Sequence, residues 1–404
     1  MGNVIMNRRS VVGGLSAAAL GSGFAFGQAA SEIRIGAPLP LTGPLAPEGR
    51  KQKRGYDLWA AEVTKQGGVD VGGRKLPVKI IYSDYQSATP RGVQACDFLV
   101  SQEKVQFLFS PFGSGAAKAG SAIAERYKIP MIAPTASSVE VYDQGFKYLF
   151  GTFTPNSTLT EPLAGLIAAK APDVKKVAIF SRNDLLPLSL AVEMRKSCQT
   201  RNLNIVYDEK FAIGTLDFAS ALTQIRAAAP DWVFVGGYIN DLVQVRAQMR
   251  DLGIKPKVCT MIAGPAYEEY IQALKGAAEN VTSASWWHPA VRYEGADLFG
   301  STARYVETFK AAYNGETPDY AEASASAAGA ILQLALKQAG TLEGPVVRDA
   351  LAALKVDTFW GPVHFGPTGQ IDSLTPPVFQ IQDGKTAVLL PDAIRQGELK
   401  FGLA

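Results

Sequence analysis

The chain has 404 residues, of which 47% are hydrophobic and 19% are charged, and its formal net charge is +3. This balance is typical of a packed globular protein and excludes a largely disordered chain, and the length predicts two domains. The basic residues form no long stripe of the kind that binds nucleic acid. Their densest group, Arg50, Lys51, Lys53 and Arg54, lies at the start of an expected helix, and we interpret it as a solvated helix face.

Residues 1–30 have the pattern of a cleavable signal peptide. Asn7-Arg8-Arg9-Ser10 precedes an apolar segment rich in Ala and Gly over 11–26, and small residues follow at 27–30. The paired arginines favour the twin-arginine route, although a Sec signal can carry them as well. The apolar segment is shorter than the ~20 residues of a membrane-spanning helix. We therefore expect export, cleavage near residues 27–30, and a mature protein that does not insert into a membrane.

From residue 32 to residue 132, short β-branched runs alternate with amphipathic segments. This alternation predicts right-handed βαβ units around a parallel sheet covered on both faces. Strands are expected at 33–35, 76–82, 106–109 and 130–132, and helices at 51–66, 90–102 and 116–127.

The same pattern starts afresh after residue 176. Strands are expected at 177–180, 204–207, 232–235 and 257–260, and helices at 188–200, 218–228 and 241–251. The sequence therefore predicts an α/β fold with two doubly wound parallel-sheet lobes. Two more helices, over 322–339 and 346–354, have no strands of their own and are expected to pack on one of these sheets.

The cysteines and histidines give no sign of a metal or cofactor site. Cys96, Cys198 and Cys259 lie far apart without a ligand spacing, and we interpret them as small buried residues. The sequence leaves open whether two of them form a disulfide. His288 and His364 are the only histidines, so we expect no histidine-based metal site and no cofactor.

Two loops that follow strands carry the chemistry of a binding site. Residues 109–115 (FSPFGSG) lead into an expected helix and contain Ser114, and residues 133–138 (APTASS) contain Thr135, Ala136 and Ser137. In open parallel sheets ligands bind outside the carboxyl ends of the strands. Hydroxyl groups and free amides at a helix start favour a carboxylate. Helix capping would explain either loop alone, but two neighbouring loops favour binding.

Aromatic residues lie at corresponding places in the second unit. Tyr238 follows Val235-Gly236-Gly237 at the end of a strand, and Trp286 and Trp287 follow the last strand of that unit. Core packing is the ordinary role of such residues. Adjacent side chains of an extended segment point to opposite faces, so one tryptophan can line a cleft while the other is core.

The catalytic motifs that we tested are broken. Ser114 lies between two glycines, but Pro111 interrupts the G-x-S-x-G frame of a hydrolase nucleophile. Residues 68–75 have the outline of a phosphate loop, but Arg74 replaces its lysine and the segment precedes a strand instead of following one. We interpret 68–75 as a turn and expect no catalysis.

The order and spacing of these residues resemble the branched-chain amino-acid (Leu/Ile/Val) binding protein family, the type I periplasmic receptors of ABC importers. The resemblance covers nearly the whole mature chain. It includes Ile35-Gly36, Leu41-Thr42-Gly43, Gly49, Arg54-Gly55, Ser114, 134–137, 236–238 and 361–365. It implies three crossings between the lobes, with lobe 1 at 31–152 and 285–362, and lobe 2 at 153–284 and 363–404.

The resemblance also implies a ligand site in the cleft between the lobes. The family's carboxylate-binding serine falls on Ser114, and its backbone contact and following hydroxyl fall on Thr135, Ala136 and Ser137. The aromatic residue of the second lobe falls on Tyr238. Trp286 or Trp287 would add an aromatic wall.

Three positions depart from the family pattern. Glu48 stands where the family often has an aromatic residue, and Leu185-Leu186-Pro187 stands where many members have Tyr-Gly. The acidic residue that pairs with the ligand ammonium falls near Ile262, which carries no charge. Because a desolvated ammonium needs a counter-charge, either Glu48 or Glu322 replaces it or the ligand has no amine. Leu186 and Ile262 would suit an aromatic or hydrocarbon ligand body.

The resemblance therefore implies a periplasmic substrate-binding protein of a branched-chain amino-acid-type ABC importer. It would deliver a small carboxylate-bearing solute, an amino acid or an aromatic or aliphatic carboxylate, to an inner-membrane permease. The alternative is a ligand-sensing receptor of the same fold, for amides or other small solutes, that signals to a regulator. The signal peptide, with no expected membrane helix or effector domain, favours transport.

Overall fold

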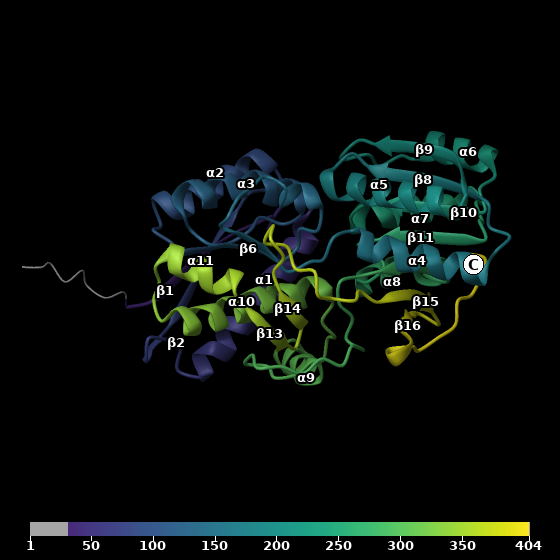
Figure 1. Cartoon of the computed structure of the whole chain (residues 1–404). Coiled ribbons are helices and arrows are strands. Elements are labelled where there is room, and N and C mark those ends of the chain that lie inside the picture. Colours follow the sequence, from purple (N-terminus) through teal and green to yellow (C-terminus); the bar gives the residue numbers. More distant parts are fainter. Residues whose placement is uncertain (1–30, 404) are drawn as a thin grey trace, which may run out of the picture. The chain divides into compact units, whose positions relative to one another are not determined.

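The structure is a computed structural model that describes residues 31–403, so the expected signal peptide lies outside the described residues. Two large sheets organise this part of the chain (Figure 1). We call the elements around the five-stranded sheet lobe 1 and those around the seven-stranded sheet lobe 2. Within residues 31–403, no helix has the length and apolar character needed to cross a membrane.

Lobe 1 is built on a parallel sheet with the strand order β4-β1-β5-β6-β7. Ile35 in β1 pairs with Ile80 on one side and with Phe107 on the other, so β1 is an inner strand and later strands add to the sheet on both sides of it. The strands are β1 (Ile33–Leu39), β4 (Val78–Asp84), β5 (Phe107–Phe109), β6 (Met131–Ala133) and β7 (Leu149–Gly151).

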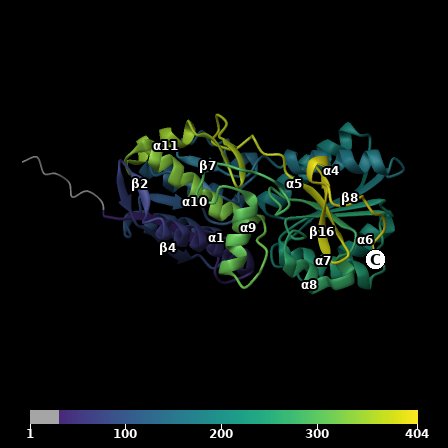
Figure 2. The same cartoon turned by 90° about the horizontal axis from the view of Figure 1, so that it is seen from below.

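Helices cover both faces of this sheet, as Figure 1 shows. Helices α2 (Thr89–Ser101) and α3 (Ser114–Tyr127) pack together on one face. On the other face α1 (Ala46–Lys65) lies beside α10 (Tyr320–Ala339), as Figures 1 and 2 both show. The smaller elements of lobe 1 are the hairpin β2 (Val69–Val71)/β3 (Arg74–Leu76), η1 (Val139–Val141), α9 (Thr302–Ala312), α11 (Gly344–Ala352) and the hairpin β13 (Lys355–Thr358)/β14 (Gly361–His364).

Lobe 2 repeats the same winding and then extends it. Its order is β16-β15-β12-β11-β10-β8-β9, parallel from β9 to β12, while β15 and β16 are antiparallel additions at the other edge. Its strands are β8 (Lys176–Arg182), β9 (Asn204–Phe211), β10 (Trp232–Gly236), β11 (Val258–Ile262), β12 (Val281–Ala284), β15 (Val378–Gln382) and β16 (Lys385–Leu390). Its helices are α4 (Ser157–Lys170), α5 (Leu185–Thr200), α6 (Ala219–Ala228), α7 (Ile239–Asp251), α8 (Glu268–Leu274), η2 (Lys275–Ala278) and η3 (Asp392–Ile394).

The chain passes between the two sheets three times: after β7, after β12, and before β15. The expected third boundary, after residue 362, falls inside β14 and differs from the structure. Val363 pairs with Val356 in β13, and Gln370 bridges to Gly151 in β7. These pairings place the chain beside the lobe 1 sheet up to about residue 371.

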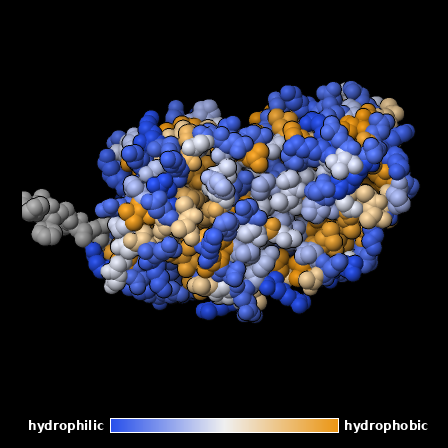
Figure 3. All heavy atoms as spheres, viewed as in Figure 1, coloured by the Kyte–Doolittle hydropathy of each residue, from blue (hydrophilic) through white to orange (hydrophobic). Residues whose placement is uncertain are grey.

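Most expected helices and strands are present with shifted ends. The segment 68–75, interpreted as a turn, is the β2/β3 hairpin, whose turn uses Gly72 and Gly73 at φ of +60° and +80°. The strands β7, β12, β13, β14, β15 and β16 and the helices α4, α8 and α9 had not been expected. The face in Figure 3 is mostly hydrophilic, with hydrophobic residues in several separate groups.

Candidate functional site

The winding of each sheet creates one crevice at the carboxyl ends of its strands. In lobe 1 the chain moves from β1 to β4 on one side and then returns to β5 on the other, so the loops after β1 and β5 diverge to opposite faces. In lobe 2 the loops after β8 and β10 diverge in the same way. Such a switch point is where open α/β sheets bind ligands. Glu48, Ser114, Leu186 and Tyr238 all follow these four strands.

The β5 and β6 loops of lobe 1 form one buried polar cluster. Ser114 is the first residue of α3, and its Oγ accepts hydrogen bonds from the amides of Ser137 (3.2 Å) and Ser138 (3.3 Å). Thr135 Oγ1 accepts from the Gly113 amide (3.3 Å). Because these hydroxyl oxygens act as acceptors here, their own protons remain available to a ligand.

The other two predicted residues of this cluster anchor the loop. Ser137 donates its hydroxyl to Asn156 Oδ1 (2.7 Å), and its carbonyl accepts from the Gln370 side chain (2.9 Å). The Ala136 carbonyl accepts from the Tyr142 hydroxyl (2.7 Å). The β6 loop is therefore tied to the chain segments that pass between the lobes.

Helix α1 adds two polar side chains to this cluster. Glu48 lies in its first turn and Gln52 one turn later, and they are 1% and 0% exposed. Gln52 Nε2 donates to Thr135 Oγ1 (3.2 Å), which connects α1 to the β6 loop. Glu48 Oε2 and Gln52 Oε1 are buried acceptors without a hydrogen-bond partner among the described residues.

Lobe 2 reaches this cluster through the start of α7. The Ile239 amide points at Glu48 Oε1 (3.4 Å), and the Tyr238 ring packs on Phe112 with centroids 5.5 Å apart. A Cβ atom on Gly113 would lie only 2.9 Å from the Tyr238 hydroxyl. Tyr238 of lobe 2 therefore meets the Ser114 loop, and Ile239 of lobe 2 meets Glu48, across the junction of the two lobes.

A buried ion pair between Arg182 and Asp241 contacts Tyr238. Arg182, the last residue of β8, pairs with Asp241 (2.9 Å), and its guanidinium lies 5.2 Å from the centre of the Tyr238 ring. Asp241 also accepts from the Tyr238 amide (3.1 Å) and completes a capping box at the start of α7. This arrangement fixes the orientation of Tyr238.

The environment of Glu48 disfavours its charge. Burial raises the pKa of Glu48 from 4.5 to about 7, and the negative Asp241 raises it further, while the amide of Ile239 and the cation of Arg182 act in the opposite direction. Near neutral pH the carboxyl group therefore lies close to its titration point. A positively charged group at Oε2 would favour the ionised form.

Trp286 occupies a run of stacked aromatic rings where the chain passes between the lobes. Its ring lies 4.0 Å from Phe153 and nearly parallel to it, and its indole N–H donates to the Thr154 carbonyl (3.1 Å). Tyr320 packs against both rings, and Tyr267 of lobe 2 stacks on Tyr320 (5.3 Å). Trp287 stacks at the other side, on Trp360 (6.4 Å). Both tryptophans are buried.

Leu186 and Ile262 are apolar and buried at the lobe 2 strand ends. Leu186 lies in the first turn of α5, and Ile262 ends β11, where it pairs with Gly236 two residues before Tyr238. Neither position supplies a charge, as expected from the sequence.

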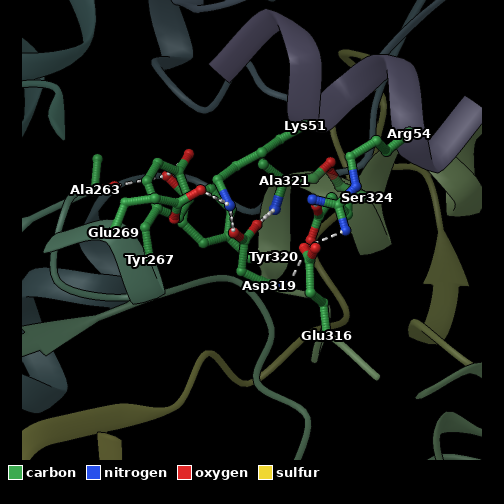
Figure 4. A network of polar contacts seen from close by, with 11 residues as sticks. Lys51, Arg54, Ala263, Tyr267, Glu269, Glu316, Asp319, Tyr320, Ala321 and Ser324 are labelled. Atoms are coloured by element: carbon green, nitrogen blue, oxygen red, sulfur yellow. Dashed lines mark hydrogen bonds and ion pairs between the residues drawn. The ribbon is translucent and has the colours of Figure 1, made fainter. Parts of the chain in front are cut away.

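A second polar network joins the lobes through Lys51, which lies on α1 like Glu48 (Figure 4). Lys51 pairs with Asp319 of lobe 1 (2.8 Å) and with Glu269 of lobe 2 (3.0 Å), and its ammonium lies over the Tyr267 ring. Tyr320 donates to the Ala263 carbonyl across the lobes (3.0 Å). The lobes are thus in direct polar contact.

Glu322, the other expected counter-charge, serves the fold instead. Its carboxylate accepts from the Asp319 amide (3.0 Å) in the capping box of α10 and pairs with Arg54 (3.3 Å). Both partners belong to lobe 1. We therefore do not assign it to the ligand.

A cavity of about 920 Å³ lies beside the Lys51 network, and it is not the predicted site. Trp287 and Glu322 line it, but Glu48, Ser114, Tyr238 and the other residues expected at the ligand site, all within the described part of the chain, do not. Among its charged lining residues, Lys51 pairs with both Asp319 and Glu269. In the described range 31–403, no three His, Cys, Asp or Glu side chains are placed to hold a metal ion, and Cys96, Cys198 and Cys259 are free and buried.

Sequence reasoning missed Gln52, Arg182, Tyr267 and Tyr320. Gln52 could have been found, because it lies four residues after Glu48 and so on the same helix face. Arg182 is a charged residue at the end of an apolar strand, which is also a usable signal. Tyr267 and Tyr320 meet across the lobes, 53 residues apart in the chain, and nothing local marks them.

The chain was compared with protein families and known proteins. The family model described as "Periplasmic binding protein" matches residues 32–385. The "Leu/Ile/Val-binding protein homolog 7" of Brucella melitensis is 25% identical over 96% of this chain and 98% of its own length. The "Leucine-, isoleucine-, valine-, threonine-, and alanine-binding protein" of Pseudomonas aeruginosa is 26% identical over 64% of this chain and 70% of its own.

Solved structures show the same fold. The substrate-binding protein LivJ of the branched-chain amino acid transporter of Streptococcus pneumoniae, in complex with isoleucine, has a TM-score of 0.79 and is 25% identical, covering 89% of this chain and 100% of its own. A solute-binding protein of an ABC transporter from R. palustris, in complex with benzoate, has a TM-score of 0.75 at 22% identity, covering 92% and 98%.

Proposed function

Because the chain belongs to the periplasmic binding protein family, whose members are substrate-binding proteins of transporters and not enzymes, we propose that it is the receptor of a branched-chain amino-acid-type ABC importer. In this proposal it captures a small carboxylate-bearing solute between its lobes and presents it to an inner-membrane permease. The observation that carries it is the buried polar cluster of Ser114, Thr135 and Ser137, to which α1 of the same lobe adds Glu48 and against which Tyr238 of lobe 2 lies.

The cluster has the chemistry that a carboxylate needs. Ser114 stands at the N-terminus of α3, where the helix dipole and the first free amides attract an anion. The hydroxyl protons of Ser114 and Thr135 remain available as donors. These groups lie in a site that the second lobe covers, and exclusion of water strengthens each hydrogen bond to the ligand.

Closure of the lobes provides the signal for transport in this proposal. Tyr238, Ile239 and Tyr267 reach lobe 1 only when the lobes are together, so a ligand that contacts both sides favours that state. The relative with isoleucine bound supports a ligand of this size. Export to the periplasm through the segment 1–30 completes the proposal.

A thermal-melt screen of residues 31–404 tests the proposed function. One panel holds branched-chain and other amino acids, and the other holds aromatic and aliphatic carboxylates and small amides. A ligand at ~1,000 times its dissociation constant adds about 4 kcal/mol to the free energy of unfolding and raises the melting temperature by several degrees. Ser114→Ala should abolish the shift.

The matched control is Ser121→Ala on the same helix, whose hydroxyl is bonded to the Lys118 carbonyl (2.7 Å) and not to the cluster. It should keep the ligand-induced shift. If neither panel shifts the melting temperature, or if both alanine variants respond alike, the cluster is not a carboxylate site.

A further inference from the structure

The buried cluster separates into a donor end and an acceptor end. The hydroxyl protons of Ser114 and Thr135 form the donor end. The acceptor end is on α1, where Glu48 Oε2 and Gln52 Oε1 are buried, lie one helical turn apart, and have no hydrogen-bond partner within residues 31–403. Leaving such acceptors unsatisfied in a closed site costs free energy unless a ligand supplies donors.

Other carboxylates near the junction already have partners. Asp241 is paired with Arg182 (2.9 Å) and Asp319 with Lys51 (2.8 Å). Asp184 accepts from the Leu185 amide (2.7 Å) at the start of α5. Glu48 differs from these three carboxylates, since its Oε1 faces only the Ile239 amide and its Oε2 has no hydrogen-bond partner among the described residues.

We propose that Glu48 is the residue that selects the ligand by a protonated nitrogen, and that α1 of lobe 1 therefore supplies the counter-charge that the second lobe lacks at Ile262. This assignment rests on the proposed function. The ligand's carboxylate lies at Ser114 and Thr135, and its ammonium lies at Glu48 Oε2 with Gln52 Oε1 as a second acceptor. Gln52 spans the two ends, because its amide nitrogen donates to Thr135 (3.2 Å).

The same residue couples recognition to closure. Glu48 belongs to lobe 1, yet its Oε1 faces the Ile239 amide at the N-terminus of α7 in lobe 2. An ionised carboxylate is attracted to that helix end more strongly than a neutral carboxyl group. A ligand cation that favours the ionised form of Glu48 thereby strengthens the contact between the lobes.

The titratable groups around Glu48 leave its carboxylate without a free counter-charge, so a ligand cation is needed to favour its ionised form. Burial holds its pKa near 7, so binding of an ammonium at Oε2 lowers the pKa and releases a proton. The charged neighbours Asp241 and Arg182 are paired with each other. The other neighbours are tyrosines whose pKa values burial raises, so they remain neutral: Tyr85, Tyr238, Tyr267 and Tyr320.

Calorimetry with matched ligand pairs tests this assignment. The pairs are L-leucine with 4-methylpentanoate and L-phenylalanine with 3-phenylpropanoate, which differ only by the ammonium. At pH 8 the unaltered protein should prefer the amine member of a pair. In Glu48→Gln we expect affinity for that member to fall about 10- to 100-fold and affinity for the amine-free member to stay or rise.

The control is Glu62→Gln, on the same helix but paired with Lys65 at the surface (2.6 Å). It should retain the preference. At pH 7, binding heats in two buffers of different ionisation enthalpy should show proton release by the unaltered protein and none by Glu48→Gln. A melting curve of the unliganded variant confirms that it is folded.

The outcomes separate the two proposals. Equal binding of both members of each pair, or an unchanged preference in Glu48→Gln, overturns the role of Glu48 and leaves the carboxylate receptor standing. If none of the four compounds binds, the assignment of Glu48 is overturned, and the carboxylate receptor stands only if another carboxylate shifts the melting temperature.

Discussion

The raised pKa of Glu48 makes the stability of the unliganded protein depend on pH. An unfolded Glu ionises at a pKa of about 4.5, whereas burial keeps the folded carboxyl group protonated up to about 7. Between these values the folded state binds more protons than the unfolded state, so the free energy of unfolding falls as the pH rises. The loss is complete above the folded pKa and amounts to at most about 3 kcal/mol.

We therefore expect Glu48→Gln to stabilise the unliganded protein at pH 8 and to leave it unchanged at pH 4. The amide keeps the size of the protonated acid but cannot ionise. Melting temperatures between pH 4 and pH 8 measure this, with Glu307→Gln on the exposed side of α9 as the control that should show no such difference. A lower melting temperature of Glu48→Gln at pH 8 would contradict the burial argument.

The sequence could place Ser114, Thr135, Ala136 and Ser137 in two neighbouring loops, and their role in ligand binding stays a prediction. Each follows a strand of a recognisable βαβ pattern. The roles of the individual oxygens could not be predicted. Whether Ser114 accepts or donates depends on the Ser137 and Ser138 amides, and these are placed by contacts to Asn156 and Gln370 far along the chain.

At the scale of elements, the α1–α10 pair is held at close range by two glycines. A Cβ on Gly329 of α10 would lie 2.1 Å from Trp59 Cδ2, and a Cβ on Gly55 of α1 would lie 2.2 Å from the Glu322 carbonyl oxygen. Trp59 is fully buried. The pair carries Glu48, Gln52, Lys51 and Tyr320, so its spacing sets the geometry of the site.

Gly329→Ala should lower the free energy of unfolding by about 1–3 kcal/mol, because the methyl group overpacks against the indole ring. The control is Gly165→Ala in α4, where the nearest atom to a Cβ is the end of the Arg201 side chain at 3.5 Å. That change should be neutral or stabilising by about 0.5–1 kcal/mol. Chemical denaturation measures the free energy of unfolding of both variants. Equal changes in the two variants would mean that the helices adjust to the added methyl group.

Expected and observed elements differ where the local pattern is short. The strand β7 has three residues and β15 and β16 follow a segment without a helical rhythm, so periodicity gives little signal. The third passage between the sheets was expected too early for the same reason. The residue pattern of a hairpin such as β13/β14 does not indicate which of the two sheets it packs against.

At the scale of the whole molecule, Lys51 forms an ion pair between the lobes. Only 8% of its side chain is exposed, and it bridges Asp319 of lobe 1 and Glu269 of lobe 2. Removing the cation leaves a buried carboxylate at Asp319 without its partner. The closed arrangement should then be less favoured.

We expect Lys51→Gln to increase the radius of gyration of the unliganded protein in small-angle X-ray scattering and to weaken ligand binding about 10-fold. The control is Lys53→Gln, which removes a half-exposed pair with Asp57 within α1 itself. It should change neither quantity. An unchanged radius of gyration in Lys51→Gln would show that the aromatic and Tyr238 contacts hold the lobes together without the ion pair.

The sequence by itself determined the class of fold, the two winding units, the hydroxyl residues at the strand ends of the proposed site, and the absence of a charge at Ile262. These follow from periodicity, from the position of hydroxyls after strands, and from residue identity. Only the tertiary structure decided which acid is free to meet a ligand. Glu48 and Glu322 are both glutamates near a helix start, but one has an unpartnered oxygen at the lobe junction and the other caps α10 and pairs with Arg54. The free energy of a buried charge depends on its neighbours in space, and a linear pattern does not contain them.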